Sequence, residues 1–289
     1  MTIFRHKRSV GSEEAEQINC ARSNSLFKEY EVGPGIFKLA EGPFISYQRT
    51  VDIDMQTSDF EVTETFSYKI SAPFWHYLLH FPMKRALKNS NSSKNFNIWW
   101  APPNRFDALT SRTVSLLCVA AIVTGFLGAL IGQTATFAAE EFGAGDRAQG
   151  ILLATVRIGV LLTVFITALA DNRGRKKLLE FSLYGGCCLA VLSAVAPNLW
   201  ALGVIQSFAR GFATSISILI GIMAAEAAPK GSRAYIAGLL TLSAGLGAGI
   251  PVWILFLADL HLKGWRLLFA TALIFFPVIR WIHLHLEES

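Results

Sequence analysis

Long apolar runs fill the chain after residue 113, separated by short polar connections. Each run approaches the roughly 20 residues that a helix needs to cross the hydrocarbon core of a bilayer. The pattern therefore predicts an all-α membrane protein segment with six transmembrane helices. The predicted spans cover residues 114–138, 149–170, 178–196, 200–225, 235–258 and 267–283.

The first 112 residues follow a different pattern, in which apolar and polar residues alternate. Residues 60–70 place Phe60, Val62 and Phe66 on one face and Glu61 and Thr63 on the other, which is typical of a half-buried strand. Residues 44–53 predict a partner strand, and residues 29–39 predict a third that Gly33-Pro34-Gly35 interrupts. A short amphipathic helix is expected from residue 72 to 81, so this part is predicted to be a small α+β segment.

These patterns divide the chain into four predicted parts. Residues 1–28 are expected to be a disordered tail, 29–88 a cytosolic strand-helix segment, 89–112 a linker and membrane-interface anchor, and 113–289 the six-span segment. Trp99 and Trp100 suit the headgroup region, where aromatic rings concentrate. Basic residues around them favour an anionic inner leaflet, and these are Lys84, Arg85, Lys88, Lys94, Arg105 and Arg112.

Composition agrees with a membrane protein. Hydrophobic residues make up 52% and charged residues 16%, against about 25% charged in soluble domains. The net charge of +5 is what basic cytoplasmic flanks of membrane helices produce, so a lipid bilayer is the expected partner and nucleic acid is not.

The charges of the connections predict the orientation. Arg173, Arg175, Lys176 and Lys177 crowd the connection after the second span, and positive connections stay in the cytoplasm. The start of the chain has no apolar stretch of the length that a signal peptide needs. The expected location is the plasma membrane, with several passes and both termini cytoplasmic. One connection conflicts with this topology, because it places the basic residues of 263–266 outside.

The stretch 168–176, Ala-Leu-Ala-Asp-Asn-Arg-Gly-Arg-Lys, resembles the signature loop of the major facilitator superfamily, G-x-L-A-D-R-x-G-R-R. Thr167 and Asn172 depart from that pattern. Residues 226–233 are similar to the family's E-x-x-P-x-x-x-R stretch, Gly264-Trp265-Arg266 to its G-W-R, and residues 286–289 to its L-P-E-S. The resemblance implies the amino-terminal six-helix half of a transporter, built as two inverted three-helix repeats.

The resemblance also implies a cytoplasmic latch. Its residues would be Asp171 and Arg175 in the loop, with Glu226 and Arg233 near them. Gly174 suits the short turn because glycine tolerates a positive φ, and Lys176 adds a second basic position. The alternative is that these residues only set the topology.

Two arginines inside spans are candidates for the substrate path. A charge at the bilayer centre costs about 2.5–3.5 kcal/mol on insertion scales, so Arg157 and Arg210 should face a polar cavity or a partner. The family often has an arginine three residues before Arg210, where this chain has Ser207, and its following glycine is kept as Gly211. The alternative for both arginines is a structural bond to a neighbouring carbonyl or hydroxyl group.

The expected function is that of a secondary carrier of a small polar solute, with no catalytic residue, no metal and no cofactor. The chain reaches the place where the family's central loop begins, so we expect a half-length carrier that needs a dimer or a separate second half. Otherwise it is a truncated product without transport activity. A non-transporting, membrane-anchored lipid-binding or assembly protein remains the alternative. The strand-helix segment bears a faint likeness to START or polyketide-cyclase domains, which leaves ligand binding there open.

Overall fold

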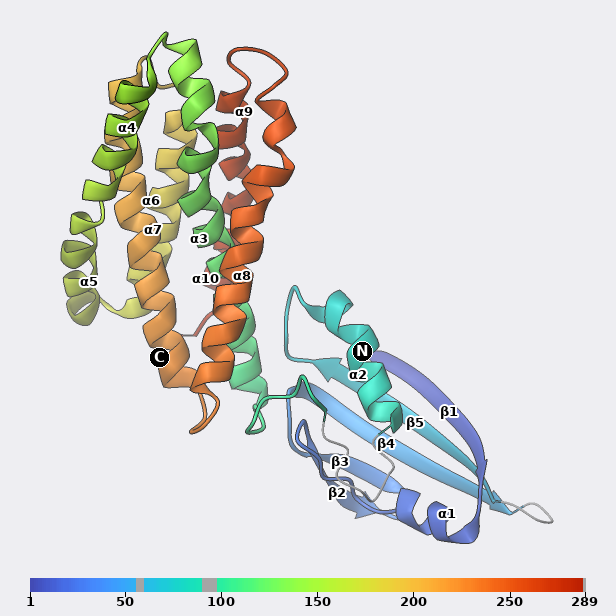
Figure 1. Cartoon of the computed structure of the whole chain (residues 1–289). Coiled ribbons are helices and arrows are strands. Elements are labelled where there is room, and N and C mark those ends of the chain that lie inside the picture. Colours follow the sequence, from blue (N-terminus) through green and yellow to red (C-terminus); the bar gives the residue numbers. More distant parts are fainter. Residues whose placement is uncertain (56–59, 90–97, 288–289) are drawn as a thin grey trace. The chain divides into compact units, whose positions relative to one another are not determined.

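The computed structural model describes residues 1–55, 60–89 and 98–287, and only the backbone of residue 55 and of residues 169–173. It divides into two compact units. The strand unit comprises Met1–Ser115 and Ala228–Tyr235, and the helical unit comprises Leu116–Ala227 and Ile236–Ser289. Figure 1 shows the elements of both.

Within the described residues of the strand unit, one antiparallel sheet has the strand order β1-β5-β4-β3-β2. The strands are β1 (Thr2–Val10), β2 (Lys28–Gly33), β3 (Ile36–Glu41), β4 (Phe44–Met55) and β5 (Phe60–Ile70), with helices α1 (Ser12–Ile18) and α2 (His76–Asn89). The predicted strands at 44–53 and 60–70 are confirmed, and the predicted interruption at Gly33-Pro34-Gly35 is the turn between β2 and β3.

Residues 1–28 are not a disordered tail. They contain β1, which pairs with β5 along its whole length, and α1. Phe4 lies opposite Phe66 and stacks on it with 4.7 Å between ring centroids. The sequence conceals this strand because Arg8 occupies an inward position beside Val10, so the alternation of β1 is not one of apolar and polar residues.

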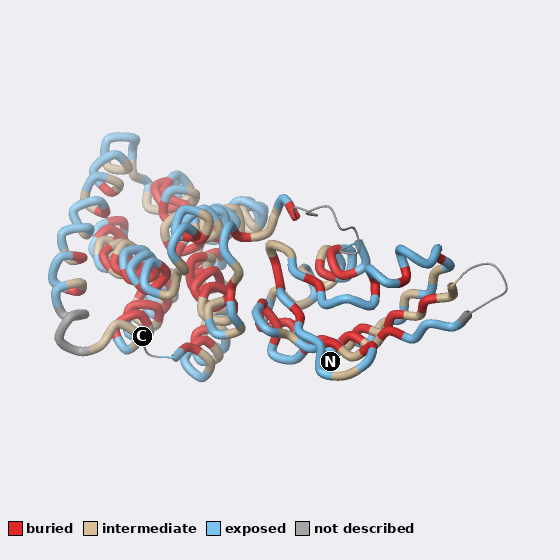
Figure 2. Tube along the Cα trace, turned by 90° about the horizontal axis from the view of Figure 1, so that it is seen from below, coloured by how far each residue is buried: buried red, intermediate tan, exposed pale blue. Residues whose placement is uncertain are grey.

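Helices α1 and α2 cover the same face of the sheet. Ala15 and Ile18 of α1 pack with Phe37, Val51 and Val62. A second cluster of buried residues lies against α2, and it includes Phe44, Tyr47, Phe66, Tyr68, Ile70, Met83, Ala86 and Leu87. Figure 2 lets the reader follow the alternation of buried and exposed positions along the strands.

The segment after α2 belongs in part to this core. Ile98 is buried, and Trp100 packs against the α2 cluster. The Trp100 carbonyl accepts a hydrogen bond from the Tyr235 hydroxyl at 2.7 Å. Trp99 is 92% exposed, so only one ring of the predicted tryptophan anchor is presented outward. Residues 90–97 of the predicted linker lie outside the described residues.

The helical unit is built from helices that run alongside one another (Figure 1). They are α3 (Ala108–Glu141, which begins in the strand unit), α4 (Asp146–Ile158), α5 (Leu161–Arg173), α6 (Arg175–Ser193), α7 (Leu199–Ala227) and α8 (Arg233–Trp253). Two short 3₁₀ turns, η1 (Leu255–Leu257) and η2 (Thr271–Ile274), and helices α9 (Trp265–Ala270) and α10 (Phe275–His285) complete it.

Among the described residues, five helical stretches are long and apolar enough to cross a membrane. They are Ala108–Glu141, Asp146–Ala168, Leu199–Ala227, Arg233–Leu257 and Trp265–His285. The remaining predicted span, 178–196, corresponds to helix α6, which is not among them. Its first turns carry Arg175, Lys176, Lys177 and Glu180, which leave fewer than 18 residues of low charge.

Burial differs sharply among these stretches. In α3, 78% of the most apolar window is buried, whereas in Arg233–Leu257 only 17% is. Helix α3 therefore forms the centre of the unit. Large apolar side chains are exposed on the outer helices, for example Phe165, Trp200 and Leu242. Exposed apolar surface on several helices is expected where lipid replaces water.

Two glycines bring α3 and α8 into backbone contact. A Cβ on Gly125 would overlap the Ala244 carbonyl, and a Cβ on Gly247 would overlap the Ile122 carbonyl. Small residues allow such approach where lipid supplies no hydrophobic drive between helices. Gly125 and Gly247 therefore allow this helix packing, whereas Gly132 on the same helix as Gly125 has nothing within 4 Å of the corresponding position.

We expect Gly125→Ala to lower the stability of the chain and Gly132→Ala not to lower it. The added methyl at Gly125 has no room beside the Ala244 carbonyl, so about 1–3 kcal/mol should be lost. At Gly132 the same methyl meets open space and should be neutral or gain up to about 1 kcal/mol from helix propensity. Thermal unfolding of the purified chain in detergent measures both, and equal midpoints would contradict the close contact.

Candidate functional site

The connection that resembles the signature loop is a one-residue break between two helices. Gly174 separates α5 from α6 and has φ 90°, which confirms the predicted need for a residue that tolerates positive φ. Arg175, the first residue of α6, forms an ion pair with Glu226 near the end of α7. The two side chains are 32% and 40% exposed. The fold thus joins the loop to the E-x-x-P-x-x-x-R stretch.

The other predicted latch residues lie at the ends of helices near the loop or in the strand unit. Asp171 lies in the last turn of α5, and its side chain is outside the described residues. Lys176 is half-buried in the first turn of α6, and Arg233 is exposed at the start of α8, in the strand unit. Among these residues, the described contacts join Arg175 to Glu226.

The two arginines of the predicted path have different surroundings. Arg210 is half-buried on α7, and its Nη1 donates to the Gly128 carbonyl of α3 at 3.2 Å. This bond to a neighbouring carbonyl matches the structural alternative for Arg210, although it uses only one of five donors. Arg157 on α4 is exposed. Ser207, three residues before Arg210, donates to the Thr155 carbonyl at 3.0 Å.

A second ion pair in the helical unit was not foreseen. Glu141, the last residue of α3, accepts from Nε and Nη2 of Arg266 at 3.0 and 2.9 Å and from the indole nitrogen of Trp265 at 2.6 Å. Arg266 also donates to the Ala194 carbonyl at 2.9 Å. This pairing explains how a basic residue is accommodated in the connection that conflicted with the predicted topology. The sequence could have indicated this pair, because Glu141 and Arg266 have opposite charges and lie in connections on the same predicted side of the membrane.

Only glycine fits at position 264, directly before Trp265 and Arg266. A Cβ on Gly264 would overlap the Leu257 carbonyl and approach the Ala258 carbonyl. The residues of the G-W-R sequence therefore act together here, since Gly264 permits the close approach while Trp265 and Arg266 hold the Glu141 carboxylate.

In the strand unit, a network of charged side chains lies on the covered face of the sheet. Glu64 of β5 pairs with Arg22, with Arg8 at 2.6 Å and with Arg49 at 3.2 Å. Glu29 of β2 pairs with Arg49 at 2.7 Å. The side chains of Arg49, Glu29 and Glu64 are fully buried, so the network must satisfy its charges internally.

The network also ties both helices to the sheet. Arg49 donates to the Ile18 and Cys20 carbonyls at 2.8 and 2.7 Å, at the carboxyl end of α1. Arg22 donates to the Leu87 carbonyl at 3.1 Å, near the carboxyl end of α2. Carbonyl groups at a helix end lack partners within the helix and carry partial negative charge, which a cation stabilises.

The protonation states follow from this geometry. Burial by itself raises the pKa of the Glu64 carboxyl, but Arg22, Arg8 and Arg49 together outweigh burial and hold that pKa below its usual range. Burial and the neighbouring Glu29 carboxylate raise the pKa of Tyr47 well above its usual value. The Tyr47 hydroxyl therefore stays protonated and donates to Glu29.

This network is suited to holding the fold rather than to catalysis. Both oxygens of Glu29 accept hydrogen bonds, from Tyr47, Arg49 and the Arg22 amide, and both oxygens of Glu64 accept from arginines. A carboxylate whose oxygens are so occupied is a poor general base. The sequence analysis missed this network because Glu64 and Arg49 occupy inward positions between apolar residues. The opposite charges of these two residues could have indicated that they pair.

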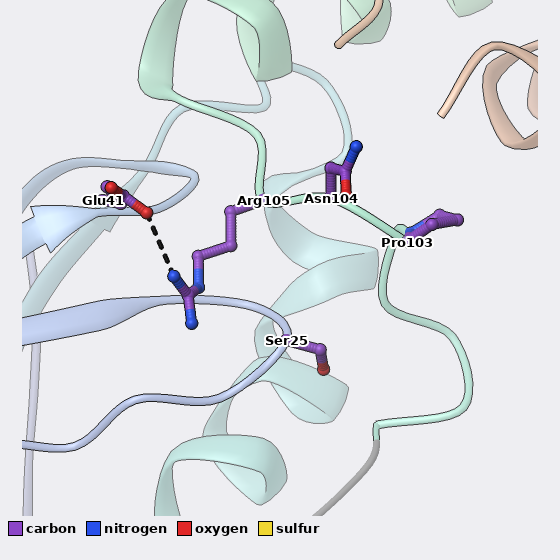
Figure 3. Close-up of a pocket in the computed structure, with 5 residues that line it drawn as sticks. All are labelled: Ser25, Glu41, Pro103, Asn104 and Arg105. Carbon is purple, nitrogen blue, oxygen red and sulfur yellow. Dashed lines mark hydrogen bonds and ion pairs between the residues drawn. The ribbon is translucent and has the colours of Figure 1, made fainter. Parts of the chain in front are cut away.

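A hollow of about 410 Å³ is lined by Ser25, Glu41, Pro103, Asn104 and Arg105 (Figure 3). Arg105 crosses it, donating to the Asn24 carbonyl at 2.8 Å, to Ser23 Oγ at 3.0 Å and to Glu41 at 3.1 Å. The guanidinium thus fastens residues 103–105 to the sheet. Arg105 was expected to meet anionic lipid, but its charge is engaged within the strand unit.

Over the part of the chain that the structure describes, no three His, Cys, Asp or Glu side chains are grouped so that they could hold a metal ion. Comparisons with models of known protein families and with curated proteins find no match to this chain. The function has to be inferred from the residues and contacts described above.

We expect Glu64→Gln to destabilise the strand unit by about 3–5 kcal/mol, because it leaves buried arginines without their counter-charge. Glu61→Gln is the matched control on the same strand. Glu61 is partly exposed and pairs with Lys7, so about 1 kcal/mol or less should be lost. Hydrogen exchange of the β4 and β5 amides in the full chain measures both, and equal effects would contradict a stabilising network.

Acid should weaken the network through Glu64. Its pKa in the folded chain lies below the unfolded value, which is about 4.3 for glutamate. The stability from this group is therefore present above about pH 4.3 and is lost as pH falls through the lower folded pKa. We expect exchange protection of β5 to drop in that acid range, and Glu64→Gln to show a smaller drop. Identical acid profiles for the two chains would contradict this assignment.

Proposed function

We propose that the helical unit is a six-helix bundle of the major facilitator type that carries a small polar solute across the plasma membrane. The ion pair between Arg175 and Glu226 is the observation that carries this proposal. It joins the two stretches whose sequences most resemble the family, and the resemblance assigns both residues to the cytoplasmic latch. In this proposal α6 crosses the membrane together with the five more apolar stretches.

The exposure of the ion pair suits a latch that opens and closes. Arg175 and Glu226 are about a third exposed or more, and ion pairs in contact with water contribute about 1 kcal/mol or less. Glu141 is only 8% exposed and meets Arg266 with two parallel hydrogen bonds and Trp265 with a third. Such bidentate, charge-assisted contacts are stronger. We infer that the two ends open in turn during transport, and that the Arg175 end opens at the lower cost because its ion pair is the weaker one.

Arg157 and Arg210 are the proposed contacts for the solute. Arg157 is exposed within an apolar stretch, and an arginine facing lipid near the bilayer centre is costly. This face of α4 is therefore proposed to border a polar path against a second six-helix bundle, supplied by another copy or another polypeptide. Two cationic side chains favour a polar or anionic solute.

The orientation follows the positive connections. Arg175, Lys176 and Lys177 begin α6, and basic connections are retained in the cytoplasm. Both termini are then cytoplasmic. Arg266 lies on the opposite side in this topology, where its pairing with Glu141 offsets its charge.

A membrane-anchored lipid-binding or assembly protein is the second candidate. The strand unit favours it, because this unit has its own core and its own buried charge network. In that case the helices would serve as an anchor, and the chain would carry no solute.

Transport by the full chain in proteoliposomes tests the proposal, with radiolabelled sugars, carboxylates and amino acids as solutes. We expect Arg175→Glu to reduce the initial uptake rate about tenfold, which is about 1.4 kcal/mol, because it places two carboxylates together at the latch. The exchanged pair Arg175→Glu/Glu226→Arg should recover most of the rate. Lys177→Glu makes the same charge change at an exposed position of α6 and should stay within about twofold of the wild type.

Loss of uptake in Lys177→Glu equal to that in Arg175→Glu would contradict a specific latch. Wild-type chain that inserts in the liposomes but takes up none of the solutes would contradict a carrier built from copies of this chain and favour the anchored binding protein.

A further inference from the structure

Helix α2 presents three different surfaces. Met83, Ala86 and Leu87 are buried against the sheet. The first turns carry apolar side chains that point away from this core, with Tyr77 90%, Leu78 69% and Phe81 72% exposed. The last turns carry the exposed basic residues Arg85 and Lys88. An exposed apolar end followed by an exposed basic end is uncommon on a helix whose other side already packs on a core.

Phe74 extends the apolar end. It lies two residues before the helix, is 53% exposed and has φ 69°, which is a strained conformation for a bulky residue. We call Phe74, Tyr77, Leu78 and Phe81 the α2 ridge.

The α2 ridge begins where the first apolar helix begins. Ser71 Oγ donates to the Ala108 carbonyl at 2.5 Å, Ser115 Oγ donates to the Pro73 carbonyl at 2.7 Å, and Trp75 Nε1 donates to the Ser115 carbonyl at 3.2 Å. All of these residues belong to the strand unit. The residues flanking Phe74 are thus bound to the first turns of α3, which is long and apolar enough to cross a membrane.

We propose that the α2 ridge inserts into the headgroup region of the leaflet at which α3 enters the bilayer, and that Arg85 and Lys88 bind anionic phospholipid there. Aromatic and leucine side chains on one surface with basic residues beside them are the composition of interfacial helices. Lys84 contributes less, because its Nζ lies 5.3 Å from the centre of the Phe4 ring. This inference rests on the membrane-spanning part of the proposed function, and it is independent of transport.

Charge favours lipid over a second copy of the chain. In a symmetric contact the same surface meets itself, so Arg85 and Lys88 would face the same basic residues of the partner. The inner leaflet instead offers phosphate and carboxylate groups of opposite charge. The ridge and the basic residues are then satisfied together by one surface.

Photo-crosslinking of the full chain tests the proposal in nanodiscs of phosphatidylcholine with and without phosphatidylglycerol. Benzoylphenylalanine replaces Leu78 or Phe81 in separate chains, and Tyr30, which is 49% exposed on β2, is the matched control position. We expect phospholipid adducts at Leu78 and Phe81, several-fold more than at Tyr30 and more with phosphatidylglycerol. Adducts to a second copy of the chain, or equal lipid yields at all three positions, would overturn the proposal.

A charge-reversal pair tests the basic end. Arg85→Glu/Lys88→Glu should reduce the adducts in phosphatidylglycerol nanodiscs about fivefold or more, since two cations become two anions. Lys38→Glu/Lys69→Glu makes the same change at exposed positions on the sheet and should leave the yield unchanged. Equal loss in both variants would contradict a local contact with anionic lipid.

The crosslinking result can be interpreted independently of the transport result. Lipid adducts at the ridge in a chain that takes up no solute would support this inference and contradict a carrier built from copies of this chain. A chain that alkaline carbonate extracts from vesicles would contradict the membrane assignment and this inference together.

Discussion

The free-energy cost of removing charge from water is the constraint on which the arrangement of both units depends. In the strand unit, Glu64 and Arg49 are buried side by side because each neutralises the other, and the spare donors of Arg49 reach the end of α1. In the helical unit, Glu141 and Arg266 meet in the same way at the ends of two helices. A buried charge that lacked such a partner would cost several kcal/mol. Each ion pair therefore keeps its two residues close together.

The same constraint separates fixed contacts from movable ones. The Glu141 carboxylate is nearly buried and receives hydrogen bonds from both Arg266 and Trp265, whereas the pair of Arg175 and Glu226 is open to water. Water competes for an exposed pair and weakens it, while burial and additional donors strengthen the other. In alternating access each end of a carrier is closed while the other is open, and ion pairs of different strength would give the two ends different costs of opening. The two ion pairs are the physical basis of the proposed mechanism.

Exposed apolar side chains on both units are suited to a bilayer rather than to water. Phe165, Trp200 and Leu242 are exposed on the helical unit and would be unfavourable in water, and Tyr77 and Leu78 on α2 are exposed in the same way. A bilayer accepts the former in its hydrocarbon core and the latter at its headgroups. The close contact of Gly125 with the Ala244 carbonyl supplies packing between helices where lipid provides no hydrophobic drive.

The sequence by itself determined the local features: the apolar runs, the alternation of β5 and the glycine turn at Gly174, because each depends on a period or a property of neighbouring residues. It also pointed to Arg175 and Glu226 as related positions, through a family resemblance. The tertiary structure alone decided which charges meet. The first strand was taken for a tail because its inward arginine is stabilised by Glu64, 56 residues away, and long-range partners leave no periodic trace. The ring of Trp100 packs against the core and that of Tyr77 is exposed, since the burial of a side chain depends on what packs against it and not on local composition.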